Sequence, residues 1–314
     1  MSSNQAQGSP AHSTHGRGIV MAILATIGYA VVDSLSKYQA RDYPVTMIVW
    51  ARYAVPLVLL LMIFLPSRGR RMLRTDFPGM QLLRGVLLTA GTVFVVLAVR
   101  AMPIAEAQAI GFIHPVLLTL LAVIFLGEKV SPLGWTAVLL GFSGVLIIVR
   151  PGGGLFTPAA LLPLGLALSY SSYQILTRMI SRKEDSINSL FCVMLVGTLV
   201  MSLALPFSWV DPTAKGFLIF ALIGIASGMG HFTIIKALEY APASLIAPFA
   251  YAQLLWVSIL GALVFGDFPD AITLLGIATV VAGGLLVAAS SRRNTNKPCP
   301  GSELQGGGGG GGSA

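Results

Sequence analysis

Long apolar runs, separated by short polar segments, recur along almost the whole chain. The apolar positions are continuous rather than alternating with a period of two, which predicts lipid-buried helices and not β-strands. Each run holds about 20 residues, enough to cross about 30 Å of hydrocarbon at 1.5 Å per residue. The predicted spans are 18–38, 44–65, 78–100, 104–126, 132–150, 157–180, 186–206, 214–238, 243–265 and 270–290. The expected fold is therefore an all-α integral membrane protein with ten transmembrane helices.

The two ends of the chain differ from these runs. Residues 1–16 are polar and rich in Ser, Gln and Gly, which predicts a disordered tail without the layout of a signal peptide. Residues 292–314 contain seven consecutive glycines and indicate a tail followed by an artificial linker. The rest divides into 17–150 and 151–291, with five predicted spans in each.

Composition narrows the class further. Hydrophobic residues make up 55% of the chain and charged residues 10%, against about 25% charged in soluble domains. The net charge of +8 comes mostly from loop Lys and Arg, without a basic, aromatic-rich stripe for nucleic acid. Cys192 and Cys299 predict neither a disulfide framework nor a metal site, and no phosphate-binding loop or hydrolase motif is present. We therefore expect no cofactor, no nucleic-acid partner and no enzymatic activity.

One stretch of sequence occurs twice. Residues 84–146 match residues 223–285 without a gap at an offset of 139 (242 − 103 = 139). The matched pairs include Gly85 with Gly224, Pro103 with Pro242, Gly127 with Gly266, and Glu128 with Asp267. Each half has an odd number of spans, so the second half enters the membrane from the opposite face. This pattern predicts the inverted repeat of a secondary transporter, with its substrate site near the midplane.

Loop charges predict the orientation. One side of the predicted bundle carries Arg17, Arg68, Arg70, Arg71, Arg74, Lys129, Arg182, Lys183, Arg292 and Arg293. The other side carries Arg41, Arg100, Arg150 and Lys215. Because the side richer in Lys and Arg is usually cytoplasmic, both termini are expected inside the cell.

Short motifs in both halves resemble a known family. The run 98–103, then His114-Pro115, then 126–128 is similar to the repeat of EamA-type carriers in the drug/metabolite transporter superfamily. Residues 237–242 and 265–267 match that repeat again, and Arg52-Tyr53 looks like its Arg-aromatic pair. The resemblance implies a ten-helix basket around a central cavity that exports small metabolites across the bacterial inner membrane. General similarity is greatest to exporters of aromatic amino acids, although Leu254 replaces one family proline and Asp267 a family glutamate.

The first and sixth spans carry similar polar faces. Tyr29, Asp33 and Lys37 follow one another at four-residue intervals, as do Tyr170, Gln174 and Arg178. Asp33 lies well inside its span, where a carboxylate is costly unless it faces a partner or a wet cavity. It is predicted either to face substrate or to pair with Lys37 near the outer surface.

Three further spans supply candidate site residues. His231 follows a GxxxG step at Gly224 and Gly228, and either bonds a neighbouring helix or contacts substrate. The fourth and ninth spans carry a second set of aromatic and amide side chains, which either line a cavity or pack beneath kinks at Pro115 and Pro248. These candidates are Gln108, Phe112 and His114 in the fourth span, and Tyr251, Gln253 and Trp256 in the ninth.

Together these features predict a carrier that works by alternating access on a small metabolite. A cavity of aromatics and amides suits an amino acid with a large apolar or aromatic side chain. A carrier of sugar phosphates would require Lys and Arg side chains that converge near the middle of the membrane, and we expect none there. The alternatives are an exporter of cationic drugs with Asp33 as counter-ion, and a non-transporting membrane assembly protein. The sequence leaves proton coupling and oligomeric state open, and a monomer is compatible with it.

Overall fold

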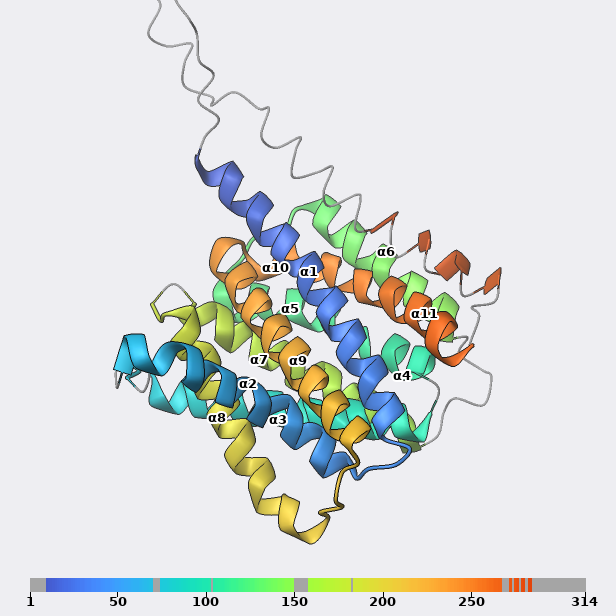
Figure 1. Cartoon of the computed structure of the whole chain (residues 1–314). Coiled ribbons are helices and arrows are strands. Elements are labelled where there is room, and N and C mark those ends of the chain that lie inside the picture. The colour runs from blue at the N-terminus through green and yellow to red at the C-terminus, as the bar shows by residue number, and fades with distance from the viewer. Residues whose placement is uncertain are drawn as a thin grey trace, which may run out of the picture.

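The computed structural model describes residues 10–69, 74–102, 104–149, 158–181 and 183–266, with parts of 271–283 (Figure 1). Every regular element in these residues is a helix. The elements are α1 (Pro10–Gln39), α2 (Val45–Arg68), α3 (Pro78–Ala101), α4 (Ile104–Gly111), α5 (His114–Leu126), α6 (Pro132–Val149), η2 (Pro158–Ala160), α7 (Leu161–Ile180), α8 (Ser186–Ala204), η3 (Leu205–Phe207), α9 (Ala214–Tyr240), α10 (Ala243–Ile246), η4 (Ala247–Tyr251) and α11 (Ala252–Phe265).

The predicted all-α membrane class is confirmed. Six helical stretches of the described chain are long and apolar enough to cross a membrane, and they begin at residues 15, 45, 78, 186, 214 and 243. The predicted span 270–290 lies mostly outside the described residues, as does Asp267. One expectation was wrong: α1 begins at Pro10, so helix rather than coil occupies residues 10–16.

The helix ends follow from local chemistry. Pro44 precedes α2 and Pro78 opens α3, positions where a missing backbone N–H costs nothing. Asp185 caps α8 by accepting hydrogen bonds from the backbone N–H groups of Ile187 and Asn188. Gly127 and Gly266, which match in the repeat, end α5 and α11 in the left-handed conformation with φ of 63° and 74°. A side chain at either glycine would be strained.

The helix contacts occur in exchanged pairs. α1 packs along α9, and α3 packs along α7 (Figure 1). If the two halves are equivalent, span one (α1) corresponds to span six (α7), and span three (α3) corresponds to span eight (α9). The contact of α1 with α9 then corresponds to the contact of α7 with α3. The contacts of α2 with α9 and of α1 with α11 have counterparts in those of α8 with α3 and of α7 with α5. This pattern is the one that a twofold relation between the halves would produce.

The GxxxG step of α9 brings this helix close to α2. A Cβ added at Gly224 would collide with the side chain of Val55 and lie 2.7 Å from the carbonyl oxygen of Ala51. At Gly228 an added Cβ would lie 2.6 Å from the Cβ of Pro56. Small residues let membrane helices approach to van der Waals contact of their backbones, so these two glycines set the spacing of the pair.

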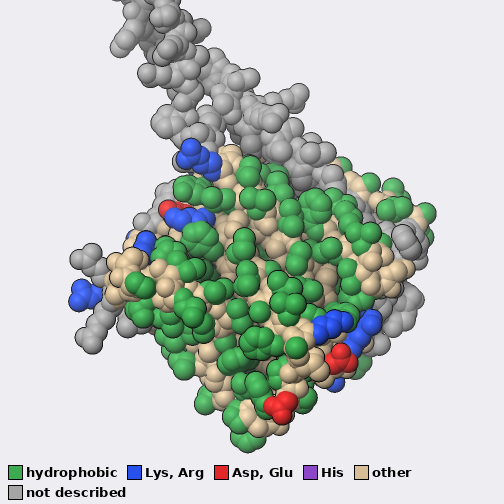
Figure 2. Space-filling view, viewed as in Figure 1, with side chains coloured by type: hydrophobic (Ala, Val, Ile, Leu, Met, Phe, Trp, Pro, Cys, Tyr) green, Lys and Arg blue, Asp and Glu red, His purple; other side chains and the backbone are tan. Residues whose placement is uncertain are grey.

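The surface has the character of a lipid-facing wall. Figure 2 shows one face covered with hydrophobic side chains, with Lys, Arg, Asp and Glu confined to two opposite edges. Large apolar side chains such as Met62, Phe207 and Leu263 are 70%, 91% and 78% exposed. A soluble protein rarely exposes so much contiguous apolar area, whereas a bilayer solvates it.

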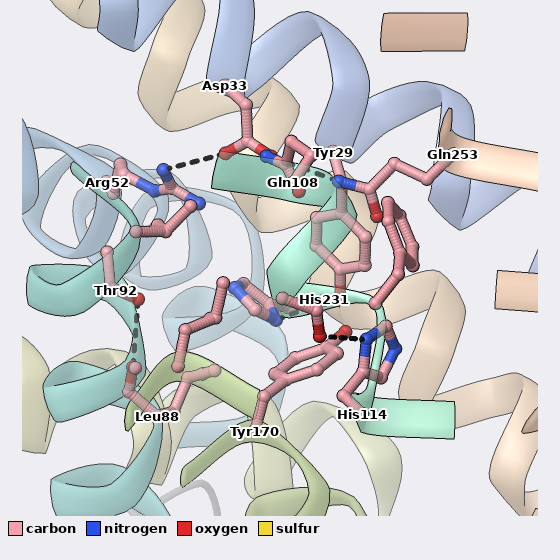
Figure 3. A pocket seen from close by; sticks show the side chains of 15 residues that line it. Tyr29, Asp33, Arg52, Leu88, Thr92, Gln108, His114, Tyr170, His231 and Gln253 are labelled. Atoms are coloured by element: carbon pink, nitrogen blue, oxygen red, sulfur yellow. Dashed lines mark hydrogen bonds and ion pairs between the residues drawn. The ribbon is translucent and has the colours of Figure 1, made fainter. Parts of the chain in front are cut away.

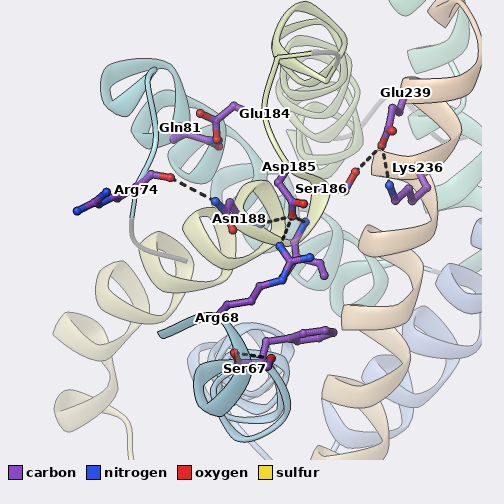
Figure 4. Close-up of polar contacts among 12 residues, drawn as sticks. Ser67, Arg68, Arg74, Gln81, Glu184, Asp185, Ser186, Asn188, Lys236 and Glu239 are labelled. Carbon is purple, nitrogen blue, oxygen red and sulfur yellow. Dashed lines mark hydrogen bonds and ion pairs between the residues drawn. The ribbon is translucent and has the colours of Figure 1, made fainter. Parts of the chain in front are cut away.

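Several residues predicted to lie on the cytoplasmic side gather at one end of the bundle (Figure 4). Arg68 pairs with Asp185 at 2.8 Å, and Asn188 donates to the carbonyl oxygen of Arg74. Partial burial raises the pKa of Asp185, but hydrogen bonds from the Ile187 N–H and from Arg68 together lower this pKa by more than burial raises it. The net shift of the pKa is therefore downward. Which end faces the cytoplasm stays a prediction.

Candidate functional site

Asp33 lies on α1, six residues before the helix ends at Gln39, and is 4% exposed, with donors from three other helices around it (Figure 3). Its Oδ1 accepts from Arg52 Nη1 of α2 at 3.2 Å. Its Oδ2 accepts from Gln108 Nε2 of α4 at 2.8 Å and from Gln253 Nε2 of α11 at 3.0 Å. Both carboxylate oxygens are therefore paired, which offsets the cost of keeping the charge out of water.

The alternative partner predicted for Asp33 was wrong. Lys37 does not bond to Asp33 but places its ammonium over the ring of Phe265, 4.9 Å from the ring centroid. The actual cation comes from α2, which the four-residue spacing along α1 could not indicate. Asp33 consequently belongs to a buried cluster and not to the outer rim.

Aromatic side chains form the opposite wall of the cluster. The Tyr29 hydroxyl shares a hydrogen bond of 3.1 Å with His231 Nδ1, which joins α1 to α9. The Tyr170 ring meets Tyr29 edge-on at 6.1 Å between centroids and His114 at 5.3 Å. Phe112 continues the wall, 5.5 Å from His114. These separations are in the range in which aromatic rings attract one another.

A cavity of about 60 Å³ lies between the polar cluster and the aromatic wall (Figure 3). Eight of the candidate residues line it: Tyr29, Asp33, Gln108, Phe112, His114, Tyr170, His231 and Gln253. Gln174 lines a smaller neighbouring cavity that shares Tyr29, His114, Tyr170 and Gln253 with the main one. The main cavity has room for a few water molecules rather than for an indole or flavin ring, so it must widen to admit a larger solute.

Tyr251 and Trp256, both predicted to line the cavity, are not among its lining residues. Tyr251 is 1% exposed and packs against Gly141 of α6, with its ring centroid 6.0 Å from that of Phe112. Trp256 is half-buried against the main hydrophobic core. Tyr251 closes η4, which has about three residues per turn, and this tighter winding turns its side chain away from the direction that an α-helix predicts.

The sequence interpretation named Arg52 only as part of a family motif and did not identify Arg52 or Arg84 as buried functional candidates. Arg52 is 5% exposed and lines the cavity, and Arg84 of α3 is fully buried. The expectation that no Lys or Arg converges at mid-depth was therefore wrong. An arginine inside an apolar run was the available signal, because such a charge is kept only where it finds partners. Thr92 also lines the cavity, although it was not predicted to do so. Its hydroxyl shares a hydrogen bond of 2.6 Å with the Tyr53 hydroxyl.

Two broken helices meet the cavity. The fourth predicted span is interrupted between Gly111 and His114, just before Pro115, which confirms the predicted kink. His114 Nδ1 donates to the freed carbonyl of Gly111 at 3.3 Å, and Ser171 Oγ donates to the carbonyl of His114 at 3.0 Å. The ninth span is interrupted in the corresponding region, where η4 joins α10 to α11. Irregular backbone at membrane depth is tolerated only where such partners or a cavity satisfy it.

A helical membrane bundle with a buried polar cavity and two interrupted helices has the architecture of a carrier. The model of the EamA-like transporter family matches residues 16–150 and 157–289. The chain belongs to the EamA-like transporter family.

Curated relatives are similar over nearly their full length. An S-adenosylmethionine uptake transporter of Rickettsia bellii is 27% identical over 90% of this chain and 97% of its own. A riboflavin transporter of Vibrio cholerae is 31% identical over 90% and 95%. A pseudopaline exporter of Pseudomonas aeruginosa is 26% identical over 87% and 94%. A solved crystal structure has the same fold, with a TM-score of 0.74 at 19% identity over 89% of this chain and 99% of its own. These relatives are named as transporters rather than enzymes.

Proposed function

We propose that this protein moves a small organic metabolite across the membrane by alternating access, with the cavity around Asp33 as its substrate site. Membership of a transporter family supports transport. The observation that carries the site is the placement of Asp33, held inside the helix bundle by donors from α2, α4 and α11, which belong to both halves. An ionisable group kept inside a membrane bundle marks a substrate or ion pathway by default.

The substrate head group is proposed to be a zwitterion such as that of an α-amino acid. Asp33 and Arg52 form an internal pair at 3.2 Å, and Arg52 Nε is buried without a hydrogen-bond partner among the described residues. A substrate ammonium bound to Asp33 and a substrate carboxylate bound to Arg52 would replace one internal ion pair with two charge-assisted contacts. A simple cationic drug suits this cluster less well, because it would place a second cation beside Arg52.

The rest of the substrate is proposed to be a planar ring. Tyr29, Phe112, His114 and Tyr170 present ring faces and edges to the cavity. Each well-placed aromatic contact contributes about 0.5–1.5 kcal/mol beyond area burial. Aromatic amino acids, the predicted substrates, combine the ring with the zwitterion. S-Adenosylmethionine, the substrate in a relative's name, also combines an amino acid with a ring system, whereas riboflavin has the ring without the zwitterion.

The direction is proposed to be export, as predicted from the sequence, through the bacterial inner membrane. The relatives include both uptake transporters and an exporter, and an uncoupled carrier runs down whichever gradient its substrate has. The exchanged helix contacts support two inverted halves, and the loop charges support cytoplasmic termini. Cysteines introduced at Gly69 and Pro212 should then react with an impermeant reagent from opposite sides of intact cells. Labelling of both from one side would exclude this orientation.

Counterflow in proteoliposomes tests the proposal. Vesicles loaded with unlabelled tryptophan or S-adenosylmethionine are expected to accumulate the same compound in labelled form transiently. Vesicles loaded with an unlabelled sugar phosphate are not expected to accumulate labelled sugar phosphate. Riboflavin is the comparison for a ring without a zwitterion, and a quaternary ammonium dye tests drug export. Counterflow of the dye alone would replace this proposal with a cationic-drug exporter. Absence of counterflow for every compound, in protein that is folded and correctly inserted, would support a non-transporting role.

A further inference from the structure

Arg84 of α3 is a fully buried guanidinium that the substrate cavity does not use. Its Nε donates to Thr177 Oγ1 of α7 at 3.0 Å, and its Nη1 donates to Ser189 Oγ of α8 at 3.1 Å and to Gln81 Oε1. Its Nη2 is buried with no hydrogen-bond partner among the described residues. All its hydrogen-bond partners in the described part of the chain are neutral, so a positive charge is buried without a bonded carboxylate.

Arg84 is connected to a carboxylate, that of Glu184, only through the side-chain amide of Gln81. Gln81 accepts from Arg84 with its carbonyl oxygen and donates from Nε2 to Glu184 Oε2 at 3.2 Å (Figure 4). Glu184 is further bound by the Thr75 hydroxyl and the Asp76 N–H at 2.9 Å each. Glutamine therefore separates the arginine from the carboxylate, and the guanidinium keeps capacity for an anion of its own.

The helix packing of this fold does not require a charge at that place. At the repeat offset, Arg84 corresponds to Ile223 of α9 (223 − 84 = 139), and Gln81, three residues before the matched stretch, falls at Phe220 (220 − 81 = 139). Phe220 and Ile223 are both buried hydrocarbon side chains. The second half fills the equivalent position at no electrostatic cost. Burying an arginine in only one half carries a desolvation penalty, so a role beyond packing is indicated.

Arg84 lies on the continuation of the cavity wall. Leu88, Thr92 and Val95 of α3 line the cavity, and Arg84 precedes Leu88 by one turn on the same helix face, about 6 Å along the axis. On α7, Tyr170 lines the cavity, and Tyr173 and Thr177 follow on the same face. The Tyr173 ring stands beside the guanidinium, 5.4 Å from its centroid to the Arg84 Cζ. The pair of walls leads from the cavity towards the end of the bundle that carries Arg68 and Asp185.

We propose that Arg84 is a second anion-recognition site, which takes the carboxylate of the substrate as it passes between the cavity and the Arg68–Asp185 end of the bundle. This inference rests on the proposed amino-acid-type substrate. When α3 and α7 separate at that end, the bonds of Nη1 to Ser189 and Gln81 are exchanged for the substrate carboxylate, which the fork of Nη1 and Nη2 can hold with two hydrogen bonds while Nε stays bound to Thr177. Arg52 and Arg84 thus form two successive carboxylate positions along one wall.

The test measures how the purified protein discriminates between L-tryptophan and L-tryptophanamide, which differ only in the carboxylate. In wild-type protein the acid should bind at least roughly tenfold tighter than the amide, read from ligand-induced shifts in melting temperature at several concentrations. Arg84→Gln should reduce this preference severalfold, and Arg84→Lys should retain part of it, because an ammonium keeps the charge but loses the fork. Arg68→Gln is the matched control on the exposed ion pair and should leave the preference unchanged.

A second variant covers the case in which Arg84→Gln does not fold. Ser189→Asp places a permanent carboxylate where Arg84 Nη1 and Gln81 Nε2 already donate, which should occupy the guanidinium and abolish the preference without lowering the melting temperature. Ser189→Ala, the matched control, should keep the preference. A wild-type protein that does not favour the acid, or variants at Arg84 and Ser189 that keep the full preference, would show that Arg84 only joins helices. Counterflow is measured separately, so its absence would refute transport without deciding the Arg84 result.

Discussion

Asp33 and Arg52 should be energetically coupled, so that removing both charges costs clearly less than the sum of removing each alone. The two side chains are only 5% and 6% exposed, so water screens their pairing little. Removing one partner of a buried ion pair costs about 3–5 kcal/mol, because the other charge is left without compensation. Asp33→Asn keeps one carbonyl oxygen for the amides of Gln108 and Gln253 but turns an N–H group towards Arg52. Arg52→Gln leaves the carboxylate with amide donors alone.

A double-mutant cycle in detergent-purified protein measures this coupling. Each single variant should lose about 3 kcal/mol of unfolding free energy, whereas the double variant should lose about 2 kcal/mol less than their sum. The exposed pair Arg68–Asp185, whose side chains are 36% and 45% exposed, is the control and should couple by less than about 1 kcal/mol. Additivity within about 0.5 kcal/mol at Asp33 and Arg52 would refute a charged pair. Asp33→Asn should also abolish tryptophan counterflow; retained counterflow with loss of proton-driven accumulation would assign Asp33 to proton coupling instead.

Two further pairs of variants separate site from packing. Tyr170→Leu should keep near-normal melting but raise the half-saturation concentration for tryptophan roughly tenfold, whereas Tyr251→Leu, outside the cavity lining, should lower the melting temperature and leave that concentration unchanged; the reverse assignment would show that η4 faces the substrate. Gly224→Ala should destabilise the protein by about 1–3 kcal/mol through overpacking against α2, while Gly28→Ala, whose added Cβ finds its nearest neighbour at 3.6 Å, should be tolerated. Equal stability of the two alanine variants in a denaturant series would contradict the close approach of α9 to α2.

Much of the membrane architecture could be predicted from the sequence because lipid imposes simple rules. The apolar runs had to be helices, and prolines marked their beginnings and the break before His114. Asp33 could be singled out on its own, since a carboxylate inside a span is costly wherever it points. Glycine spacing in α9 likewise indicated a close neighbour, although not that the neighbour is α2.

What the sequence could not supply is which helices meet. Spacing along α1 offers only Lys37 as a cation for Asp33, while the actual partner, Arg52, is 19 residues away on another helix. The repeat register pairs Phe112 with Tyr251, but the tighter winding of η4 places the second ring in the core rather than at the cavity. Side-chain direction depends on local winding and on helix contacts, and neither is encoded in a matching position alone.

The interruption between α4 and α5 has a mechanical consequence. Gln108, on α4, binds Asp33, and His114, on α5, forms part of the aromatic wall, so the two sides of the cavity stand on two segments joined at Gly111. A bend at this joint would open one mouth of the pathway and loosen the grip on the solute in the same stroke. The same joint would then control both solute binding and the opening of the pathway, so the solute could be released only as its exit forms. Such an arrangement disfavours uncoupled leakage through a state that is open at both ends, because that state would also have lost the contacts made by Gln108 on α4 and His114 on α5.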